Sequence, residues 1–185
     1  MHPLLAITRL HSAPISYDVL YTPSTRTVVD RTTHIAVPTH TLSQPATEPP
    51  TPASARVILR SDRFPWPVIV GSSSSSKSGS GSKFYLGGSE KPSRAAITNL
   101  DVLYALHSTL LTCITPQEWE ALGHGSRAQR KVTQAYESRC KRMGGGWEGG
   151  VRRIDWLHGK TRLVGVEVDK YGQGHGIGRL VFGKP

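Results

Sequence analysis

The chain has 185 residues, 37% of them hydrophobic, and a formal net charge of +10. Its length favours one domain with a core of its own, and no apolar run reaches the roughly 18 residues that span a membrane. Two cysteines cannot build a disulfide framework, and the apolar stretch in residues 1–7 is too short for a signal peptide. We expect a single domain over 1–185 in an intracellular protein, cytoplasmic or nuclear.

The first half of the chain predicts short strands separated by Pro-rich and Ser-rich segments. Runs of β-branched and aromatic residues that end at turn residues predict strands at 15–21, 35–37, 56–60, 67–70 and 83–86. Residues 64–67, Phe-Pro-Trp-Pro, predict a rigid bend. The five prolines in 38–54 predict an extended surface segment without helix or central strand. The Ser/Gly run at 71–82 predicts a flexible loop, which makes 83–86 the hairpin partner of 67–70.

Three helices are predicted next in the chain. Apolar residues recur at helical spacing in 97–114, so this helix is largely buried, with Thr98 or Asn99 as its cap. Residues 115–118, Thr-Pro-Gln-Glu, form a capping box for a short helix that ends near 122. Ser126 caps a third helix, which ends at about residue 143 before three glycines.

The C-terminal part predicts strands again. Residues 151–157 read as a strand, and the turn at 158–160 would join it to a hairpin partner at 161–168. A last short strand is expected at 179–182. The order of strands, helices and strands indicates an α+β fold, with a mainly antiparallel sheet and two to three helices packed on one face.

Six segments together resemble an uncharacterised domain family that is abundant in mushroom-forming fungi. They occur in order along nearly the whole chain, at 2–5 (HPLL), 15–19 (ISYDV), 66–70 (WPVIV), 97–103 (ITNLDVL), 135–139 (AYESR) and 151–159 (VRRIDWLHG). The resemblance implies a single α+β domain in which the low-complexity tracts are variable insertions. It implies no activity, cofactor or catalytic residue.

Metal and phosphate sites are not favoured by the spacing of the relevant residues. Cys113 and Cys140 lie 27 positions apart, whereas structural zinc sites use close ligand pairs, so we expect both as small buried hydrophobic residues in helices. The glycine-rich run 171–178 is followed by a strand, whereas a phosphate loop needs a helix there. Asp155 is expected to pair with a nearby Arg or to cap a turn. We therefore predict no metal, no cofactor and no catalytic residue.

The basic charge is the clearest functional indication. Residues 124–162 hold 10 Lys and Arg against 3 Asp and Glu, a net charge of +7. A region of this kind attracts polyanions, although a solvated face that keeps the protein soluble has the same composition. The candidate binding residues are Arg127, Arg130, Lys131, Lys141, Arg142 and Arg152.

Three functional hypotheses remain open on the sequence. The first is a non-enzymatic binding or scaffold module that docks an acidic protein partner through the basic residues. The second is weak, sequence-tolerant binding of nucleic acid, although few aromatic residues (7%) are present for stacking on bases. The third is an enzyme whose active site has no recognisable motif.

Overall fold

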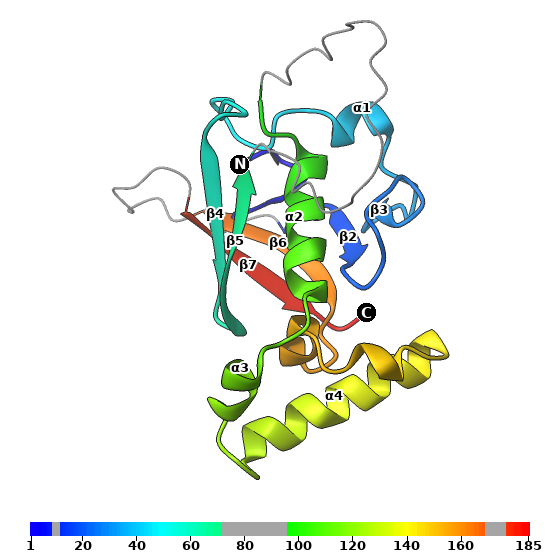
Figure 1. Ribbon diagram of the computed structural model, residues 1–185. Helices are drawn as coiled ribbons and strands as arrows, with labels where there is room; N and C mark the ends of the chain where they lie inside the picture. Colours follow the sequence, from blue (N-terminus) through cyan, green and yellow to red (C-terminus); the bar gives the residue numbers. More distant parts are fainter. Residues whose placement is uncertain (9–11, 72–95, 169–176) are drawn as a thin grey trace, which may run out of the picture.

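The computed structural model describes residues 1–8, 12–71, 96–168 and 177–185 (Figure 1). These residues form a seven-stranded sheet in the order β3-β2-β6-β7-β4-β5, with β1 beside β6. Most neighbouring strands are antiparallel, while β1 with β6 and β4 with β7 are parallel. The strands are β1 (Ala6–Ile7), β2 (Ile15–Asp18), β3 (Val28–Asp30), β4 (Arg56–Ser61), β5 (Phe64–Gly71), β6 (Arg162–Val168) and β7 (Ile177–Gly183). The predicted α+β class is confirmed.

In the view of Figure 1, α2 lies in front of the sheet, α3 and α4 lie below it, and α1 lies beside the upper end of α2. Helix α2 crosses in front of the sheet and contacts β5, whereas α4 lies below and packs against the 3₁₀ helix η2. The helices are α1 (Thr39–Leu42), α2 (Asn99–Leu111), α3 (Pro116–Glu120), α4 (Arg127–Met143), η1 (Trp147–Gly149) and η2 (Arg153–Leu157). None of the helices in the described residues is long and apolar enough to cross a membrane.

Each of the three predicted helices begins at an N-cap residue that the sequence predicts. Thr98 caps α2 through a capping box with Asp101, and Thr115 does the same for α3 with Glu118. The hydroxyl of Ser126 accepts a hydrogen bond from the backbone N–H of Gln129 at the start of α4. This helix ends at Gly144, which takes the left-handed conformation that favours glycine.

The hydrophobic core lies between α2 and the sheet. Helix α2 contributes four buried apolar residues to this core, Val102, Leu103, Leu106 and Leu110. Helix α4 buries much less, because only Val132, Arg139 and Cys140 of its seventeen residues are buried. One face of α4 is therefore free to carry charged side chains toward solvent.

The prediction of a strand at 151–157 is wrong, and so is the prediction that it forms a hairpin with 161–168. Residues Ile154, Asp155, Trp156 and Leu157 are buried in succession, which a half-exposed strand does not allow, and they form η2 instead. The carboxylate of Asp155 accepts from the backbone N–H of Arg152 and so closes the turn. Strand β6 pairs with β2 and β7 rather than with this segment.

Two proline-based predictions also need correction. The bend predicted at 64–67 is part of strand β5, which lies at the edge of the sheet, where a proline without an N–H is tolerated. The segment 38–54 is not extended throughout, because the one-turn helix α1 starts directly after Pro38. A proline that precedes the first turn removes no helical hydrogen bond.

Other early predictions meet a mixed outcome. The piece predicted at 35–37 makes a single bridge, from Ala36 to Val29 of β3. Strand β4, which covers the strand predicted at 56–60, is the partner of β5. The flexible loop predicted at 71–82 (apart from Gly71), the strand predicted at 83–86 and most of the glycine-rich run 171–178 lie outside the described residues.

Candidate functional site, a basic cleft beside α4

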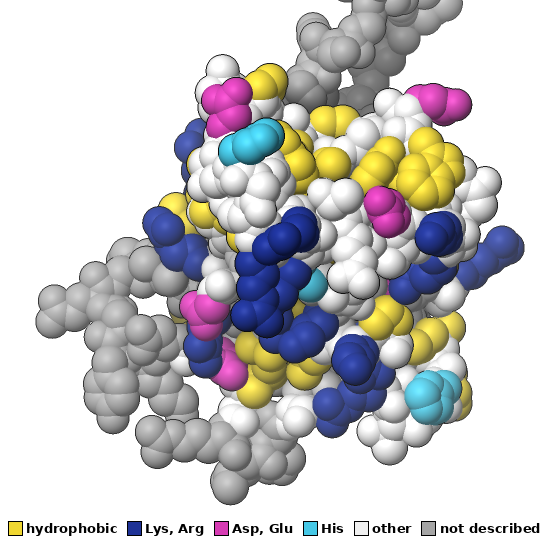
Figure 2. All heavy atoms as spheres, turned by 90° about the horizontal axis from the view of Figure 1, so that it is seen from below, with side chains coloured by type: hydrophobic (Ala, Val, Ile, Leu, Met, Phe, Trp, Pro, Cys, Tyr) yellow, Lys and Arg dark blue, Asp and Glu magenta, His cyan; other side chains and the backbone are white. Residues whose placement is uncertain are grey.

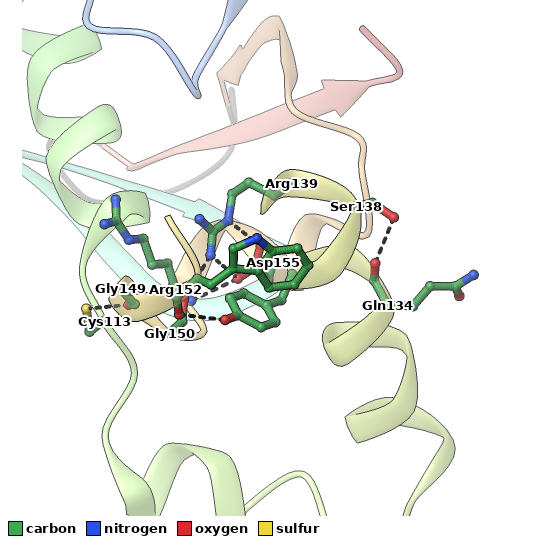
Figure 3. A network of polar contacts seen from close by, with 10 residues as sticks. Cys113, Gln134, Ser138, Arg139, Gly149, Gly150, Arg152 and Asp155 are labelled. Atoms are coloured by element: carbon green, nitrogen blue, oxygen red, sulfur yellow. Dashed lines mark hydrogen bonds and ion pairs between the residues drawn. The ribbon is translucent and has the colours of Figure 1, made fainter. Parts of the chain in front are cut away.

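A buried ion pair joins α4 to η2. The guanidinium of Arg139 donates from Nε to Oδ1 of Asp155 at 2.8 Å and from a terminal nitrogen to Oδ2 at 3.0 Å. Their side chains are only 9% and 2% exposed. A two-point Arg–carboxylate contact fixes both distance and orientation, so this pair sets how α4 lies against η2 (Figure 3).

The remaining hydrogen-bonding capacity of the pair is also used. Arg139 donates to the backbone carbonyl of Gly150 at 2.9 Å, and Asp155 accepts from the backbone N–H of Arg152 at 2.9 Å. The guanidinium also lies over the ring of Tyr136, 5.4 Å from its centroid. This network confirms that Asp155 both pairs with an Arg and caps a turn.

The guanidinium of Arg139 stays protonated in this environment. Burial opposes the charged form, but the hydrogen bonds and negative charge of Asp155 outweigh it and raise the pKa of Arg139. The two charges neutralise each other inside the protein. Neither charge is therefore available to a ligand, and the role of the pair is to hold α4 against η2.

Two adjoining hollows open between α4 and the turn that follows η2, and we call them together the α4 cleft. The inner hollow has a volume of about 80 Å³ and is lined by Leu20, Ala135, Ser138, Arg139, Arg142, Ile154, Asp155, Gly159 and Thr161. The outer hollow is open to solvent, with a volume of about 560 Å³, and is lined by Arg63, Lys131, Gln134, Ala135, Ser138, His158, Gly159 and Lys160. The hollows share Ala135, Ser138 and Gly159.

The outer hollow is positively charged. Arg63 comes from the turn between β4 and β5, Lys131 from α4, and Lys160 from the turn before β6. The residues that line this hollow include no Asp or Glu. In Figure 2 a band of Lys and Arg side chains crosses the lower face, the side on which α4 lies. Three elements distant in sequence therefore bring positive charge to one hollow, where a negative group would be attracted.

His158 lies among these cations in an unusual backbone conformation. Its φ of 48° is in the left-handed region, as is the φ of 78° of Gly159, and the two residues turn the chain sharply from η2 toward β6. Partial burial and the charges of Lys131, Arg63 and Lys160 lower the pKa of His158. These surroundings therefore disfavour the protonated ring.

We expect His158 to titrate below the ordinary histidine value of about 6.5, and its pKa to rise in Lys131→Glu. A lowered folded-state value means that the unfolded chain binds the proton more readily. The associated stability is complete above about pH 6.5 and is lost as the pH falls through the lower value. NMR titration of the imidazole protons measures this shift. A rise as large in Arg130→Glu, which changes a residue outside the cleft lining, would contradict the local origin of the effect.

The structure places two of the six candidate residues in the cleft. Lys131 lines the outer hollow, and Arg142 lines the inner hollow while its guanidinium contacts the carboxylate of Asp18 at 2.9 Å. Arg127, Arg130 and Lys141 are exposed on α4 but do not line either hollow. Arg152 is half-buried at the start of η2, beside Gly149.

Sequence reasoning missed Arg63, His158, Lys160 and Thr161. The sequence predicts the turn at 158–160, but a strand at 151–157 would orient the side chains of this turn differently from η2. Arg63 lies 64 residues before Arg127, the first residue of α4, and no local pattern links the two. The distribution of charge could have suggested Lys160, which belongs to the basic stretch 124–162.

The cysteine prediction is half right. Cys140 is buried in α4, whereas Cys113 is exposed after the end of α2, where its thiol donates to the carbonyl of Gly149 at 3.4 Å. Exposure follows from the early end of α2, because Thr112 is already extended. No group of three or more His, Cys, Asp and Glu residues in the described part of the chain could hold a metal ion.

Comparison with known proteins adds one finding. The model of the family of unknown function DUF6699 matches residues 15–174. The chain belongs to this family. The predicted resemblance to a family of unknown function is thereby confirmed, although its segment at 2–5 lies before the matched region. All residues that line the α4 cleft lie within the match. No curated protein and no solved structure matches the chain.

Proposed function

We propose that this domain is a non-enzymatic binding module that docks an acidic segment of a partner protein in the α4 cleft. The observation that carries the proposal is the convergence of Arg63, Lys131 and Lys160 on one hollow without a lining carboxylate. Like charges held close together repel one another, and a negatively charged ligand would relieve that repulsion.

The lining residues favour an acidic protein over nucleic acid. His158 carries the only ring among the lining residues, which include no Phe, Tyr or Trp, whereas modules that bind single strands stack successive bases on several aromatic rings. Nucleic acid is the second candidate because Arg127, Arg130 and Lys141 extend the positive charge along α4 beyond the cleft. Such a surface would bind phosphates with a steep dependence on salt.

We expect a fluorescent peptide of glutamates to bind the protein at low salt and to be weakened at moderate salt. The double variant Lys131→Glu/Lys160→Glu should weaken this binding by at least about tenfold, because it places negative charge in the hollow that receives the carboxylates. Fluorescence anisotropy measures the affinity.

The matched control is Arg130→Glu/Lys141→Glu, which makes the same change in net charge at exposed positions outside the cleft lining. This control should keep most of the affinity. Equal losses in the two double variants would show that net charge alone attracts the peptide. A random oligonucleotide that binds much more tightly than the peptide would make nucleic acid the preferred partner.

A further inference from the structure

The cations of the outer hollow have no anionic partner within the described part of the chain. The two arginines of the inner hollow each pair with an aspartate. By contrast, Arg63, Lys131 and Lys160 take part in none of the ion pairs found among the described residues. Their guanidinium and ammonium groups therefore keep both their charge and their hydrogen-bond donors for a ligand.

The three cations act together on one side chain of the outer hollow. Besides partial burial, which has the largest effect, the charges of Lys131, Arg63 and Lys160 each lower the pKa of His158. Interactions between charges fall off with distance and are screened by salt, so this effect requires all three charged groups to lie near the imidazole ring. His158 itself lines the hollow. The positive charge therefore converges near one point of the hollow.

Helix α4 presents one face to this point. Four residues spaced by three and four positions share that face and line the outer hollow: Lys131, Gln134, Ala135 and Ser138. The single acidic residue of α4, Glu137, lines neither hollow. A negative group can therefore approach Lys131 past small side chains without meeting a carboxylate of this helix.

A phosphate monoester suits this concentration of charge better than carboxylates do. A phosphorylated serine carries about 1.5 to 2 negative charges at pH 7 on three acceptor oxygens, whereas a glutamate carries a single charge. Side chains on the same face of an extended segment lie roughly 7 Å apart, so two glutamates cannot place their charges at one point. Arginine, with its planar fork, and lysine, as a point charge, both bind phosphate.

His158 supplies a further donor for such a group. A dianion beside the ring offsets the three cations, so its binding should raise the pKa of His158. The protonated imidazole can then donate to a phosphate oxygen. Because the outer hollow is open to solvent, the phosphate keeps part of its hydration, which limits the cost of taking its charge out of water.

We infer that the acidic segment carries a phosphorylated serine or threonine and that the outer hollow binds its phosphate group. This inference rests on the proposed function, because the phosphate belongs to the segment that docks in the α4 cleft. Arg63, Lys131 and Lys160 hold the phosphate, and His158 completes the set of donors. The phosphodiesters of nucleic acid carry one charge each and match this set less well.

The test uses three fluorescent glutamate peptides that differ only in a central pair, which is serine–glycine, phosphoserine–glycine or glutamate–glutamate. The third peptide matches the charge of the second. We expect the phosphoserine peptide to bind about tenfold more tightly than the glutamate–glutamate peptide, measured by fluorescence anisotropy. It should also raise the pKa of His158 by more, which NMR titration of the imidazole protons measures.

Two arginine variants locate the phosphate. Arg63→Gln should remove most of the preference for phosphoserine, because it removes one of the three cations and its fork of donors. The matched control is Arg60→Gln, which changes an exposed arginine of β4 that lines neither hollow. This control should keep the preference.

Equal affinity of the phosphoserine and glutamate–glutamate peptides would overturn this inference and leave the proposed function in place. Equal losses of the preference in Arg63→Gln and Arg60→Gln would also overturn it, because the phosphate would then lie outside the outer hollow. A random oligonucleotide that displaces the phosphoserine peptide at a lower concentration than the unlabelled peptide does would assign the hollow to nucleic acid. Failure of all three peptides to bind at low salt would overturn the proposed function as well.

Discussion

Replacing Arg139 with methionine is expected to lower the free energy of unfolding by about 3–5 kcal/mol. Methionine keeps most of the side-chain volume but leaves the carboxylate of Asp155 buried without its partner, at 2% exposure. Taking a charge out of water without compensation is expensive, and the link between α4 and η2 is lost as well. Urea denaturation measures the effect.

Two controls separate this effect from the loss of any arginine. Arg142→Met breaks the more exposed pair with Asp18 on the same helix and should cost no more than about 1 kcal/mol. The double variant Arg139→Met/Asp155→Leu removes both charges and should recover much of the loss. A double variant less stable than Arg139→Met would contradict the view that the unpaired carboxylate is the main cost.

We expect Gly165→Ala to destabilise the protein by about 3 kcal/mol or more. Gly165 lies in β6 with a φ of 147°, and an added Cβ would lie 2.7 Å from the side chain of Ala13 and 2.9 Å from the carbonyl oxygen of Leu5. That carbonyl accepts a hydrogen bond from Val166 at 2.7 Å, so it cannot move away without breaking the sheet. Thermal and urea unfolding report the loss.

Gly125→Ala provides the comparison. Gly125 also has a positive φ, 66°, but an added Cβ would meet no atom within 4 Å. Gly125→Ala should lower the free energy of unfolding through backbone strain alone, by about 1 kcal/mol. Similar losses at both positions would show that conformation, and not the close approach of β1 to β6, makes glycine necessary at 165.

Helix positions could be predicted because their signals are local. Thr98, Thr115 and Ser126 each cap a helix within a few residues of their own position. The error at 151–157 has the opposite cause. That segment includes the strand formers Val, Ile and Trp, but its conformation depends on Asp155, whose partner Arg139 lies in α4. An ion pair between separate elements has no periodicity for the sequence to reveal.

The candidate site was predictable only as a region. The concentration of charge indicates α4, yet the sequence could not say which of its basic residues line a hollow. Lys131 lines the outer hollow and Arg142 lines the inner hollow, whereas Arg130 and Lys141 line neither. Arg63 lines the outer hollow and Thr161 lines the inner hollow, and the sheet brings both of them to α4. Neither carries a local signal that distinguishes it from an ordinary surface or strand residue.

The strand order has a consequence for how the chain reaches its native state. The middle of the sheet is occupied by β6 and β7, which lie between β2 and β4 although they come last among the strands. During synthesis, β2 and β4 lack their central partners until more than a hundred residues beyond β4 have been added to the chain. Contacts that distant in sequence slow folding and leave unpaired strand edges open to misassociation. We therefore expect polypeptides that stop before β6 to aggregate instead of folding partially.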